Sequence, residues 1–406
     1  MGANARVVIV QFGSYAAGVR RLAAGGPETF YAQRYSIDVV ADLATQVRGI
    51  WVVGLGADEP EEQLPSGVRS LGIELYPRGR APRRRALIAA LERLRPDHLV
   101  LASPILSVLA WARLRRVRTL PIFADSFRAS GLRSRLRYVL LARALRGPHI
   151  EWISNHNLAA SLDLARIGVD RRKILPFDWP ALLSPADRPA KTLRRGTSFD
   201  VIYVGQISEA KGVGDLLRAM RLLADDPSAP AIRLTIVGGD DGSFAERARA
   251  LDLGDRVRFA GRIPHERVVP LMNEHDAVVV ASRHEYPEGL PMTIYEAFCS
   301  RTPIVASDHP MFGFQIRDGE SALVYPAGDA RALADRLKQL AGDPTLYANL
   351  SLAAESAAAD FFCPLKQHEL FGRWLSGTEE DRRFLAGFSL ASGRYDARLA
   401  RAVRTP

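Results

Sequence analysis

Two glutamates, Glu288 and Glu296, stand eight positions apart, with Gly289 and Pro291 between them. Pro291 suits the first position of a helix, because its φ is fixed near the helical value and its missing N–H has no helical partner there. We therefore expect Glu288 in the loop before a helix, and Glu296 inside that helix, about 7–8 Å along its axis from Pro291. Carboxylates so far apart cannot bind one atom. They can bind the two ends of an elongated ligand, such as a nucleoside-diphosphate sugar, whose anionic middle lies at the helix N-terminus.

Glycine-containing loops elsewhere could bind the same kind of anion. Gly25-Gly26 is expected to lead into a helix that starts at Pro27 and runs to about Val47, so that the backbone could approach a ligand closely. Gly205-Gln206 follows a predicted strand, and Lys211 stands at the start of the next helix. The helix dipole disfavours a lysine at this end, so Lys211 indicates a nearby anion. Taken singly, each loop could also be an ordinary strand-to-helix turn.

Other kinds of site lack their sequence signatures. Neither half has G-x-G-x-x-G after its first strand, and G-x-x-x-x-G-K-[ST] does not occur, so a nicotinamide, flavin or P-loop site is not supported. The segment Gly238–Gly242 follows a strand directly and is interpreted as a turn. The chain has two cysteines, Cys299 and Cys363, which excludes a cysteine-rich zinc site and fits a reducing compartment. No metal and no cofactor are expected.

Short β-branched runs alternate with amphipathic stretches in both halves, which predicts parallel sheets built from βαβ units. Strands are expected at 6–10, 50–53, 98–102, 120–123 and 150–153 in the first half, and at 200–204, 233–237, 257–260, 277–280, 304–306 and 322–324 in the second. Helices of the second half are expected at 212–224, 243–252, 265–274, 291–299 and 329–341.

This pattern predicts two similar domains. We expect an N-terminal Rossmann-like domain over 1–182, a polar, proline-bearing linker over 183–198, and a C-terminal Rossmann-like domain over 199–360. A helix over 361–376 could cross back to the first domain, and the Arg- and Ala-rich tail over 377–406 has no assigned role. A ligand would bind at the carboxyl ends of the strands.

The net charge is +10 and belongs to the N-terminal part, because residues 1–180 hold 27 Lys and Arg against 15 Asp and Glu. This excess favours an anionic ligand or membrane surface, although a merely solvated face is the alternative. The longest apolar stretch, 99–112, is too short to span a bilayer, and no signal peptide is recognised. We expect a cytoplasmic protein that could lie at the inner face of the cytoplasmic membrane.

The order of the motifs resembles the family 4 retaining glycosyltransferases of the GT-B fold. The resemblance is dense over 200–345 and runs through Val204-Gly205, Lys211-Gly212, Ile236–Gly239, 256–261, Glu288–Glu296, Thr302–Ser307 and Gly319–Leu323. The first half matches more loosely, through Gly25-Gly26, 153–155 and 168–169. The resemblance implies two Rossmann-like domains with parallel sheets that face each other across a cleft. The N-terminal domain would lie on the acceptor side, and the C-terminal domain would bind the nucleotide sugar.

The resemblance also implies roles for the matching residues. Glu288 would contact the donor sugar, Glu296 the ribose hydroxyls, and Lys211 the diphosphate. The remaining donor-binding positions implied by the family pattern are Gly25, Gly26, Gly205, Gln206, Arg262, Ile263, Gly289, Leu290 and Pro291. Arg262 and Ile263 would meet the base through their backbone.

Two positions depart from the family pattern. Gln206 stands where the family usually has an arginine, which removes one positive charge near the diphosphate. Ala124 stands where the family often has a histidine, and Asp125 could take over its polar contact, which makes Asp125 a catalytic candidate beside Glu288 and Lys211. His284 and His309 lie in the site region and are interpreted mainly as packing or surface residues.

The implied activity is retaining transfer of a hexose from a UDP- or GDP-sugar to a glycan or lipid-linked acceptor, in bacterial polysaccharide or glycolipid synthesis. An epimerase or phosphorylase on the same scaffold and a non-catalytic binding scaffold remain alternatives. Nucleic-acid binding is not expected, because no basic-aromatic motif accompanies the arginine excess.

Overall fold

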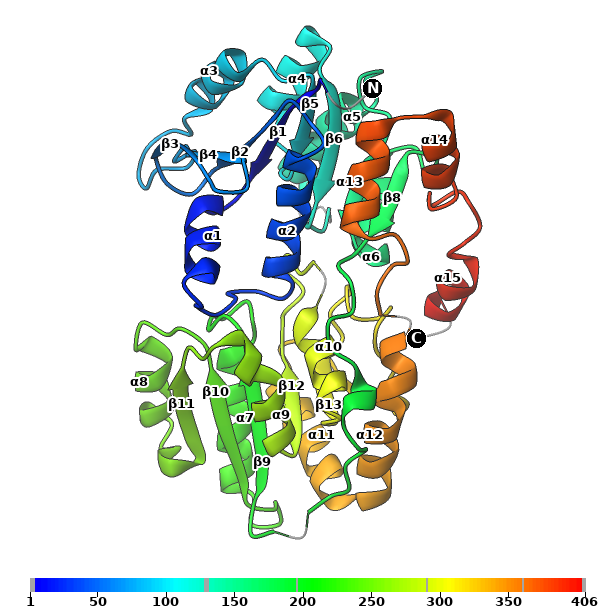
Figure 1. Ribbon diagram of the computed structural model, residues 1–406. Coiled ribbons are helices and arrows are strands. Elements are labelled where there is room, and N and C mark those ends of the chain that lie inside the picture. Colours follow the sequence, from blue (N-terminus) through cyan, green and yellow to red (C-terminus); the bar gives the residue numbers. More distant parts are fainter. Residues whose placement is uncertain (1–3, 128–130, 195, 290, 360, 404–406) are drawn as a thin grey trace. The chain divides into compact units, whose positions relative to one another are not determined.

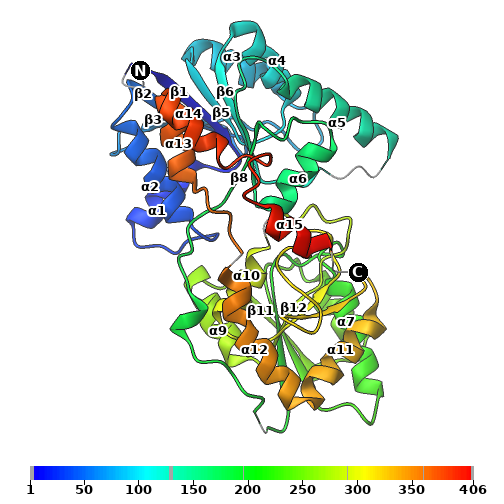
Figure 2. The ribbon, with the colours of Figure 1, turned by 90° about the vertical axis from the view of Figure 1, so that its right-hand side faces the viewer.

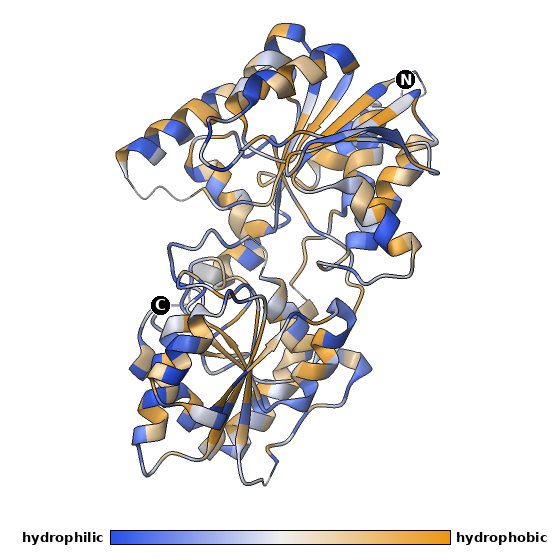
Figure 3. Cartoon of the chain, turned by 90° about the vertical axis from the view of Figure 1, so that its left-hand side faces the viewer, coloured by the Kyte–Doolittle hydropathy of each residue, from blue (hydrophilic) through white to orange (hydrophobic). Residues whose placement is uncertain are grey.

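The computed structural model describes residues 4–127, 131–194, 196–289, 291–359 and 361–403. The chain divides into two compact units (Figure 1). Unit 1 comprises Met1–Pro180 and Cys363–Leu399, and unit 2 comprises Ala181–Phe362 and Ala400–Pro406. In each unit, helices pack against a central sheet whose strands are rich in hydrophobic residues (Figure 3).

Unit 1 is built on an eight-stranded sheet of order β3-β4-β2-β1-β5-β6-β7-β8. Its strands are β1 (Arg6–Gln11), β2 (Gly49–Gly54), β3 (Glu59–Gln63), β4 (Arg69–Gly72), β5 (His98–Leu101), β6 (Arg118–Phe123), β7 (Ile153–His156) and β8 (Ile174–Phe177). The β3–β4 pair is antiparallel and the other pairs are parallel. The central strand β1 is a continuous buried run, as a strand covered on both faces requires.

The helices of unit 1 come from both ends of the chain (Figure 2). The N-terminal ones are α1 (Tyr15–Ala23), α2 (Gln33–Ala44), α3 (Arg84–Leu94), α4 (Leu106–Arg115), α5 (Leu132–Leu145) and α6 (Leu158–Arg166). The C-terminal ones include α13 (Gln367–Ser376) and α14 (Glu379–Ala386), and α15 (Asp396–Val403) ends the described chain. Leu370 and Trp374 of α13 lie in the same hydrophobic core as Val7 and Ile9 of β1. This shared core ties the C-terminal segment to unit 1.

Unit 2 is built on a six-stranded parallel sheet of order β11-β10-β9-β12-β13-β14. Its strands are β9 (Phe199–Val204), β10 (Ile232–Val237), β11 (Val257–Gly261), β12 (Ala277–Val280), β13 (Ile304–Ser307) and β14 (Leu323–Tyr325). Its helices are α7 (Val213–Asp225), α8 (Ser243–Ala250), α9 (Val268–Glu274), α10 (Met292–Cys299), α11 (Ala330–Gly342) and α12 (Pro344–Ala359), with short 3₁₀ turns at Pro185–Asp187, Gly254–Arg256 and His265–Arg267.

The prediction of two α/β units with parallel sheets is confirmed, and each strand predicted in the second half lies within one residue of its observed bounds. One strand of the first half was misplaced. The predicted strand at 150–153 is β7 at Ile153–His156, because Ile150 N–H donates to Gly147 O and closes a turn before the strand begins. The strands β3, β4 and β8 were not predicted. The polar edge strand β3 lacks the apolar alternation that marks a half-buried strand.

The predicted helix from Pro27 was also wrong. Gly25 and Gly26 end α1 instead: Gly26 N–H donates to Arg21 O, Gly25 N–H donates to Leu22 O, and Gly25 has a φ of +76°. This is the pattern of a Schellman cap, which needs glycine because the residue after the helix is left-handed. The next helix, α2, begins only at Gln33.

Candidate functional site

The carboxyl ends of the unit 2 strands bring the predicted donor loops together. Gly205 and Gln206 follow β9, whereas Glu288 lies in the loop between β12 and α10. Because β9 and β12 are parallel neighbours, both loops leave the same edge of the sheet. Arg283 N–H donates to Ala210 O at 2.9 Å and joins the two loops directly.

Glu288 occupies the centre of this loop pair. Its side chain is buried, with the residue 7% exposed. Its Oε1 accepts hydrogen bonds from Ser282 Oγ at 2.5 Å and from Lys211 Nζ at 2.6 Å. Glu288 precedes α10 as predicted, and Pro291 is the N-cap residue of α10 instead of its first helical residue. Leu290, which was predicted to contact the donor, lies outside the described residues.

Lys211 is held by a carboxylate and an aromatic ring. Besides its bond to Glu288, its Nζ lies 4.2 Å from the centre of the Tyr286 ring. A lysine at a helix start predicts a nearby anion. In the structure Glu288 supplies that anion, so Lys211 by itself does not indicate a bound ligand. The pair nevertheless holds a cation beside the start of α7, where a diphosphate could reach it.

Glu296 lies inside α10, as predicted, and is 5% exposed. Burial raises the pKa of its carboxyl to about 8, because the charged form loses its hydration there. His265 Nε2 lies 3.5 Å from Glu296 Oε1. Around neutral pH this carboxyl is therefore largely protonated, and it can both donate and accept hydrogen bonds.

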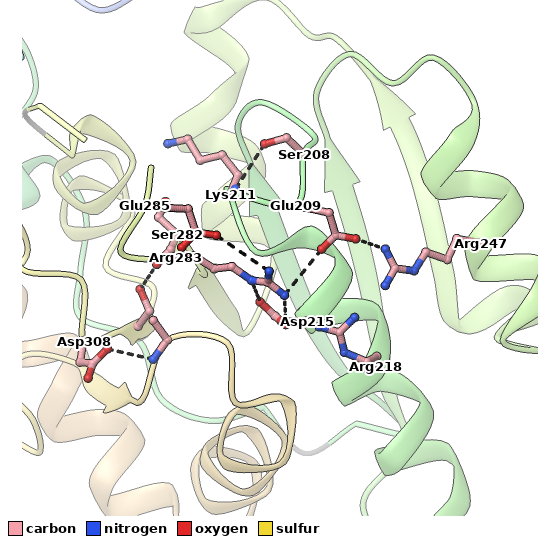
Figure 4. A network of polar contacts seen from close by, with 12 residues as sticks. Ser208, Glu209, Lys211, Asp215, Arg218, Arg247, Ser282, Arg283, Glu285 and Asp308 are labelled. Atoms are coloured by element: carbon pink, nitrogen blue, oxygen red, sulfur yellow. Dashed lines mark hydrogen bonds and ion pairs between the residues drawn. The ribbon is translucent and has the colours of Figure 1, made fainter. Parts of the chain in front are cut away.

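A network of charges around Arg283 fixes the two loops (Figure 4). Arg283 forms a two-pronged contact with the fully buried Asp215 of α7, at 2.7 Å from Nε to Oδ2 and 2.8 Å from Nη2 to Oδ1. Its Nη2 also lies 3.7 Å from Glu209, which pairs with Arg247 on its other side. The bonds to Asp215 raise the pKa of Arg283. Sequence reasoning missed this network, because Arg283 and Asp215 are distant in the chain and neither stands in a recognisable pattern.

Gly212 allows the close approach of the two loops. It is the N-cap of α7 with a φ of +74°, and a Cβ there would lie 2.0 Å from Ala281 O. Any other residue would meet both a left-handed backbone conformation and a backbone clash. The other predicted residues of unit 2 lie at the same sheet edge, since Arg262 and Ile263 follow β11 and the Arg262 guanidinium packs against Gly239.

Gln206 is held on both its backbone and its side chain. Tyr203 Oη donates to Gln206 O at 2.7 Å, and Tyr286 Oη lies 3.4 Å from Gln206 Oε1. His309 Nε2 lies 3.1 Å from Tyr286 O, which agrees with its interpretation as a packing residue of the loop. His284 lies 2.8 Å from Asp308 at the surface.

Unit 1 contains a separate cavity of about 460 Å³ at the carboxyl ends of its strands, which we call the unit 1 cavity. Its aromatic lining consists of Phe12, Tyr15, Phe30, Phe123, His156, Phe177, Trp179 and Phe371. Ala124 lines it as well, whereas the predicted catalytic Asp125 is exposed and is not among the lining residues. Gly25 and Gly26 do not line it either. Sequence reasoning missed this cavity, because its walls come from strands and helices far apart in the chain.

Within the described part of the chain, no three His, Cys, Asp or Glu side chains gather into a group that could hold a metal ion. The helices described also include none with the length and apolar character needed to cross a membrane.

Residues 186–357 match the glycosyl transferases group 1 family. A D-inositol 3-phosphate glycosyltransferase of Nocardia farcinica is 34% identical over 188 residues, which make up 44% of this chain and 41% of that protein. One from Acidothermus cellulolyticus is 31% identical over 244 residues, or 57% of this chain and 53% of that protein. The chain thus spans about half the length, or less, of these curated relatives.

Solved structures share the fold at low sequence identity. Anabaena Alr3699/HepE in complex with UDP and glucose has a TM-score of 0.63 at 15% identity, covering 88% of this chain and 96% of that chain. WaaG, a glycosyltransferase involved in lipopolysaccharide biosynthesis, also has a TM-score of 0.63 at 15% identity, covering 92% and 100%. The predicted resemblance to GT-B glycosyltransferases is confirmed. Residues 186–357 thus match the glycosyl transferases group 1 family, and the chain has the GT-B fold of the solved glycosyltransferases.

Proposed function

We propose that this chain transfers a hexose from a UDP- or GDP-sugar to a hydroxyl of a glycan or lipid-linked acceptor, with retention of configuration and without a metal. The observation that carries the proposal is the placement of Glu288, Lys211 and Glu296 around the start of α10. Solved structures of the same fold bind UDP, glucose or UDP-glucose. The group 1 match covers the unit that holds these three residues.

In the proposed reaction the diphosphate lies between Lys211 and the N-terminus of α10, where a positive charge and unpaired N–H groups favour an anion. The bond from the anomeric carbon to the diphosphate oxygen breaks, and its electron pair stays on the diphosphate. The acceptor oxygen then bonds to the anomeric carbon on the same face, and its proton passes to the diphosphate. Stabilising the leaving group is therefore the main task, which fixed charges and dipoles perform well.

The two glutamates then have different tasks. Glu288 is fixed by Ser282 and Lys211, so its second oxygen can accept a hydrogen bond from a sugar hydroxyl. Glu296 is buried farther along α10 and can bind the ribose hydroxyls. Tight binding of the ribose favours the ionised form of Glu296, because the carboxylate then accepts two hydroxyl protons.

Variants of this site test the proposal. Glu288→Gln should abolish sugar transfer while UDP binding, measured by calorimetry, stays within a few-fold of wild type. Lys211→Met should weaken UDP binding by about 10–100-fold, which corresponds to the free energy of one charged hydrogen bond. Glu246→Gln and Lys338→Met, both elsewhere on unit 2, serve as matched controls. Full transfer activity in Glu288→Gln would contradict the assignment, and product formed from a UDP-sugar without acceptor would indicate an epimerase.

We also propose that unit 1 binds an anionic membrane surface through α5. Its exposed apolar side chains are Leu132, Leu136, Val139 and Leu140, which are 83%, 62%, 61% and 47% exposed. Their spacing of four, three and one residues puts them on one face of the helix. The sequence of α5 also has four arginines and no acidic residue. Exposed apolar side chains flanked by arginines favour the interface of an anionic bilayer.

Vesicle co-sedimentation tests this surface. The wild type should bind phosphatidylglycerol-containing vesicles more than phosphatidylcholine vesicles, and less at high salt. Leu132→Ser combined with Leu136→Ser should reduce binding, whereas Leu352→Ser, which alters an exposed leucine of unit 2, should not. Equal binding by the double variant would refute docking through α5.

A further inference from the structure

Unit 1 has a second cavity, of about 530 Å³, at the amino ends of its strands, which we call the basic cavity. Arg118 is the first residue of β6, Glu151 lies two residues before β7, and Lys173 directly precedes β8. Because these strands are parallel, the basic cavity lies at the other end of the sheet from the unit 1 cavity. The strand β6 has six residues and is therefore about 20 Å long, and no described residue lines both cavities.

The lining of the basic cavity carries a surplus of positive charge. Its cationic side chains are Arg116, Arg118, Lys173 and Arg382, and the one acidic side chain among the described lining residues is Glu151. Two arginines share this carboxylate, since Glu151 Oε2 lies 3.1 Å from Arg118 Nη2 and Oε1 lies 2.7 Å from Arg382 Nε. Like charges gathered in one cavity repel one another, so this arrangement costs stability that a bound anion would restore.

Three of the cations keep N–H groups that a ligand could use. Arg116 is exposed, and its guanidinium has no hydrogen bond or ion pair with any residue that the structure describes. Arg382 donates to Glu151 through Nε, which leaves both of its Nη groups. Lys173 Nζ donates to Ile150 O at 2.8 Å and carries further protons. Three side chains from different elements can therefore donate to one oxyanion.

Local structure explains only part of this arrangement. Arg116 is the C-cap residue of α4, where the helix dipole favours a cation. That reason does not apply to Lys173 at a strand start, nor to Arg382, which α14 of the C-terminal segment brings to the N-terminal strands. His149 also lines the cavity, but both of its ring nitrogens are buried, so it offers no contact to a ligand.

We propose that the basic cavity binds the phosphate monoester group of a small ligand that is not a substrate of the proposed sugar transfer. A monoester carries about 1.5 to 2 negative charges at neutral pH and three acceptor oxygens, which match the surplus charge and the available N–H groups. The phosphate contacts Arg116, Lys173 and Arg382. Because Arg382 belongs to α14 and the other two belong to the N-terminal part of the chain, the bound phosphate fastens the C-terminal segment to the sheet and stabilises unit 1.

Calorimetric titration of the full chain at physiological salt tests this site. The probes are glycerol 3-phosphate, which is a soluble monoester, glycerophosphocholine, which is a diester, and uncharged glycerol. We expect glycerol 3-phosphate to bind about tenfold or more tightly than the other two, because the dianion forms stronger charged hydrogen bonds. It should also raise the unfolding temperature of unit 1, followed by tryptophan fluorescence.

Two double variants separate the cavity from the general positive charge of the chain. Arg116→Gln combined with Arg382→Gln should weaken glycerol 3-phosphate binding about tenfold or more, through the loss of charged hydrogen bonds. Arg84→Gln combined with Arg85→Gln removes the same charge from the exposed start of α3, outside the lining, and should leave this binding unchanged. UDP binding, which reports unit 2, should be the same in both double variants and shows that they are folded.

Vesicles distinguish a lipid headgroup from a soluble ligand as the source of the phosphate. Phosphatidic acid, a monoester lipid, is compared with phosphatidylglycerol, a diester lipid, in vesicles of equal surface charge. A lipid ligand predicts stronger co-sedimentation with phosphatidic acid that Arg116→Gln with Arg382→Gln abolishes, whereas a soluble ligand predicts no such preference and retained binding of glycerol 3-phosphate.

The inference is overturned if neither glycerol 3-phosphate nor phosphatidic acid is preferred over its diester counterpart. Equal weakening of the binding in the two double variants would overturn it as well, since only general charge would then be involved. Either result would leave the proposed transfer untouched, because that proposal depends on Glu288 and on UDP binding.

Discussion

The carboxyl of Glu296 makes the stability of unit 2 fall as pH rises. A carboxylate whose pKa is lowered by an ion pair has the opposite effect. Burial raises the pKa of Glu296 from an ordinary value near 4.5 to about 8. Below about pH 4.5 the group is protonated in both the folded and the unfolded chain. Between pH 4.5 and 8 the unfolded chain releases the proton and the folded chain keeps it, so the free energy of unfolding falls as pH rises.

The size of this loss follows from the two pKa values. A rise from about 4.5 to about 8 corresponds to roughly 4–5 kcal/mol, at about 1.4 kcal/mol per pH unit. Glu296→Gln removes the titration and keeps the size of the side chain. Gln itself loses some hydration when buried, so we expect the variant to exceed wild type by roughly 2–4 kcal/mol at pH 8.5. At pH 5 the two proteins should differ by about 1 kcal/mol or less.

Urea unfolding at pH 5, 7 and 8.5, followed by circular dichroism, measures this difference. All five tryptophans of the chain lie in unit 1, so tryptophan fluorescence reports that unit and serves as an internal reference. Glu266→Gln is the matched control, because Glu266 is exposed and stands next to His265, the neighbour of Glu296. A wild-type stability that does not fall relative to Glu296→Gln between pH 5 and 8.5 would refute the assignment of a protonated, buried carboxyl.

Three further predictions concern backbone and buried groups. Gly212→Ala should destabilise unit 2 by about 2–4 kcal/mol in urea unfolding, because its Cβ would clash with Ala281 O in a left-handed conformation. Asp178→Ala should lower the stability of unit 1 by roughly 2–4 kcal/mol, measured by tryptophan fluorescence, because buried donors including Cys363 N–H lose their acceptor; unchanged stability would contradict its anchoring role. Both thiols should resist a thiol reagent at pH 8 until the protein unfolds, because burial raises the pKa of Cys299 to about 12 and that of Cys363 well above its usual range; rapid labelling of folded protein would contradict this.

The sequence was sufficient for the parts of this protein that local patterns encode. Buried parallel strands are continuous β-branched runs, so the strands of unit 2 were placed within one residue. Glycine and proline mark the start of α10, which put Glu288 in the loop and Glu296 in the helix. Glycine gave a wrong prediction at Gly25 and Gly26, because a glycine pair can end one helix as readily as it can precede another.

The tertiary structure decided which side chains meet. The partner of Lys211 is Glu288, 77 positions away, and Arg283 meets Asp215 across 68 positions, so no local pattern could reveal either pair. The C-terminal segment returns to unit 1 and supplies a donor to Asp178, whose Oδ1 lies 2.9 Å from His156 Nδ1. Burial, which raises the pKa of Glu296, likewise exists only after the chain has folded. Sequence alone determined the kind of loops available, because turns and strands depend on near neighbours. Charge state, cavity shape and partner choice depend on residues that only folding brings together.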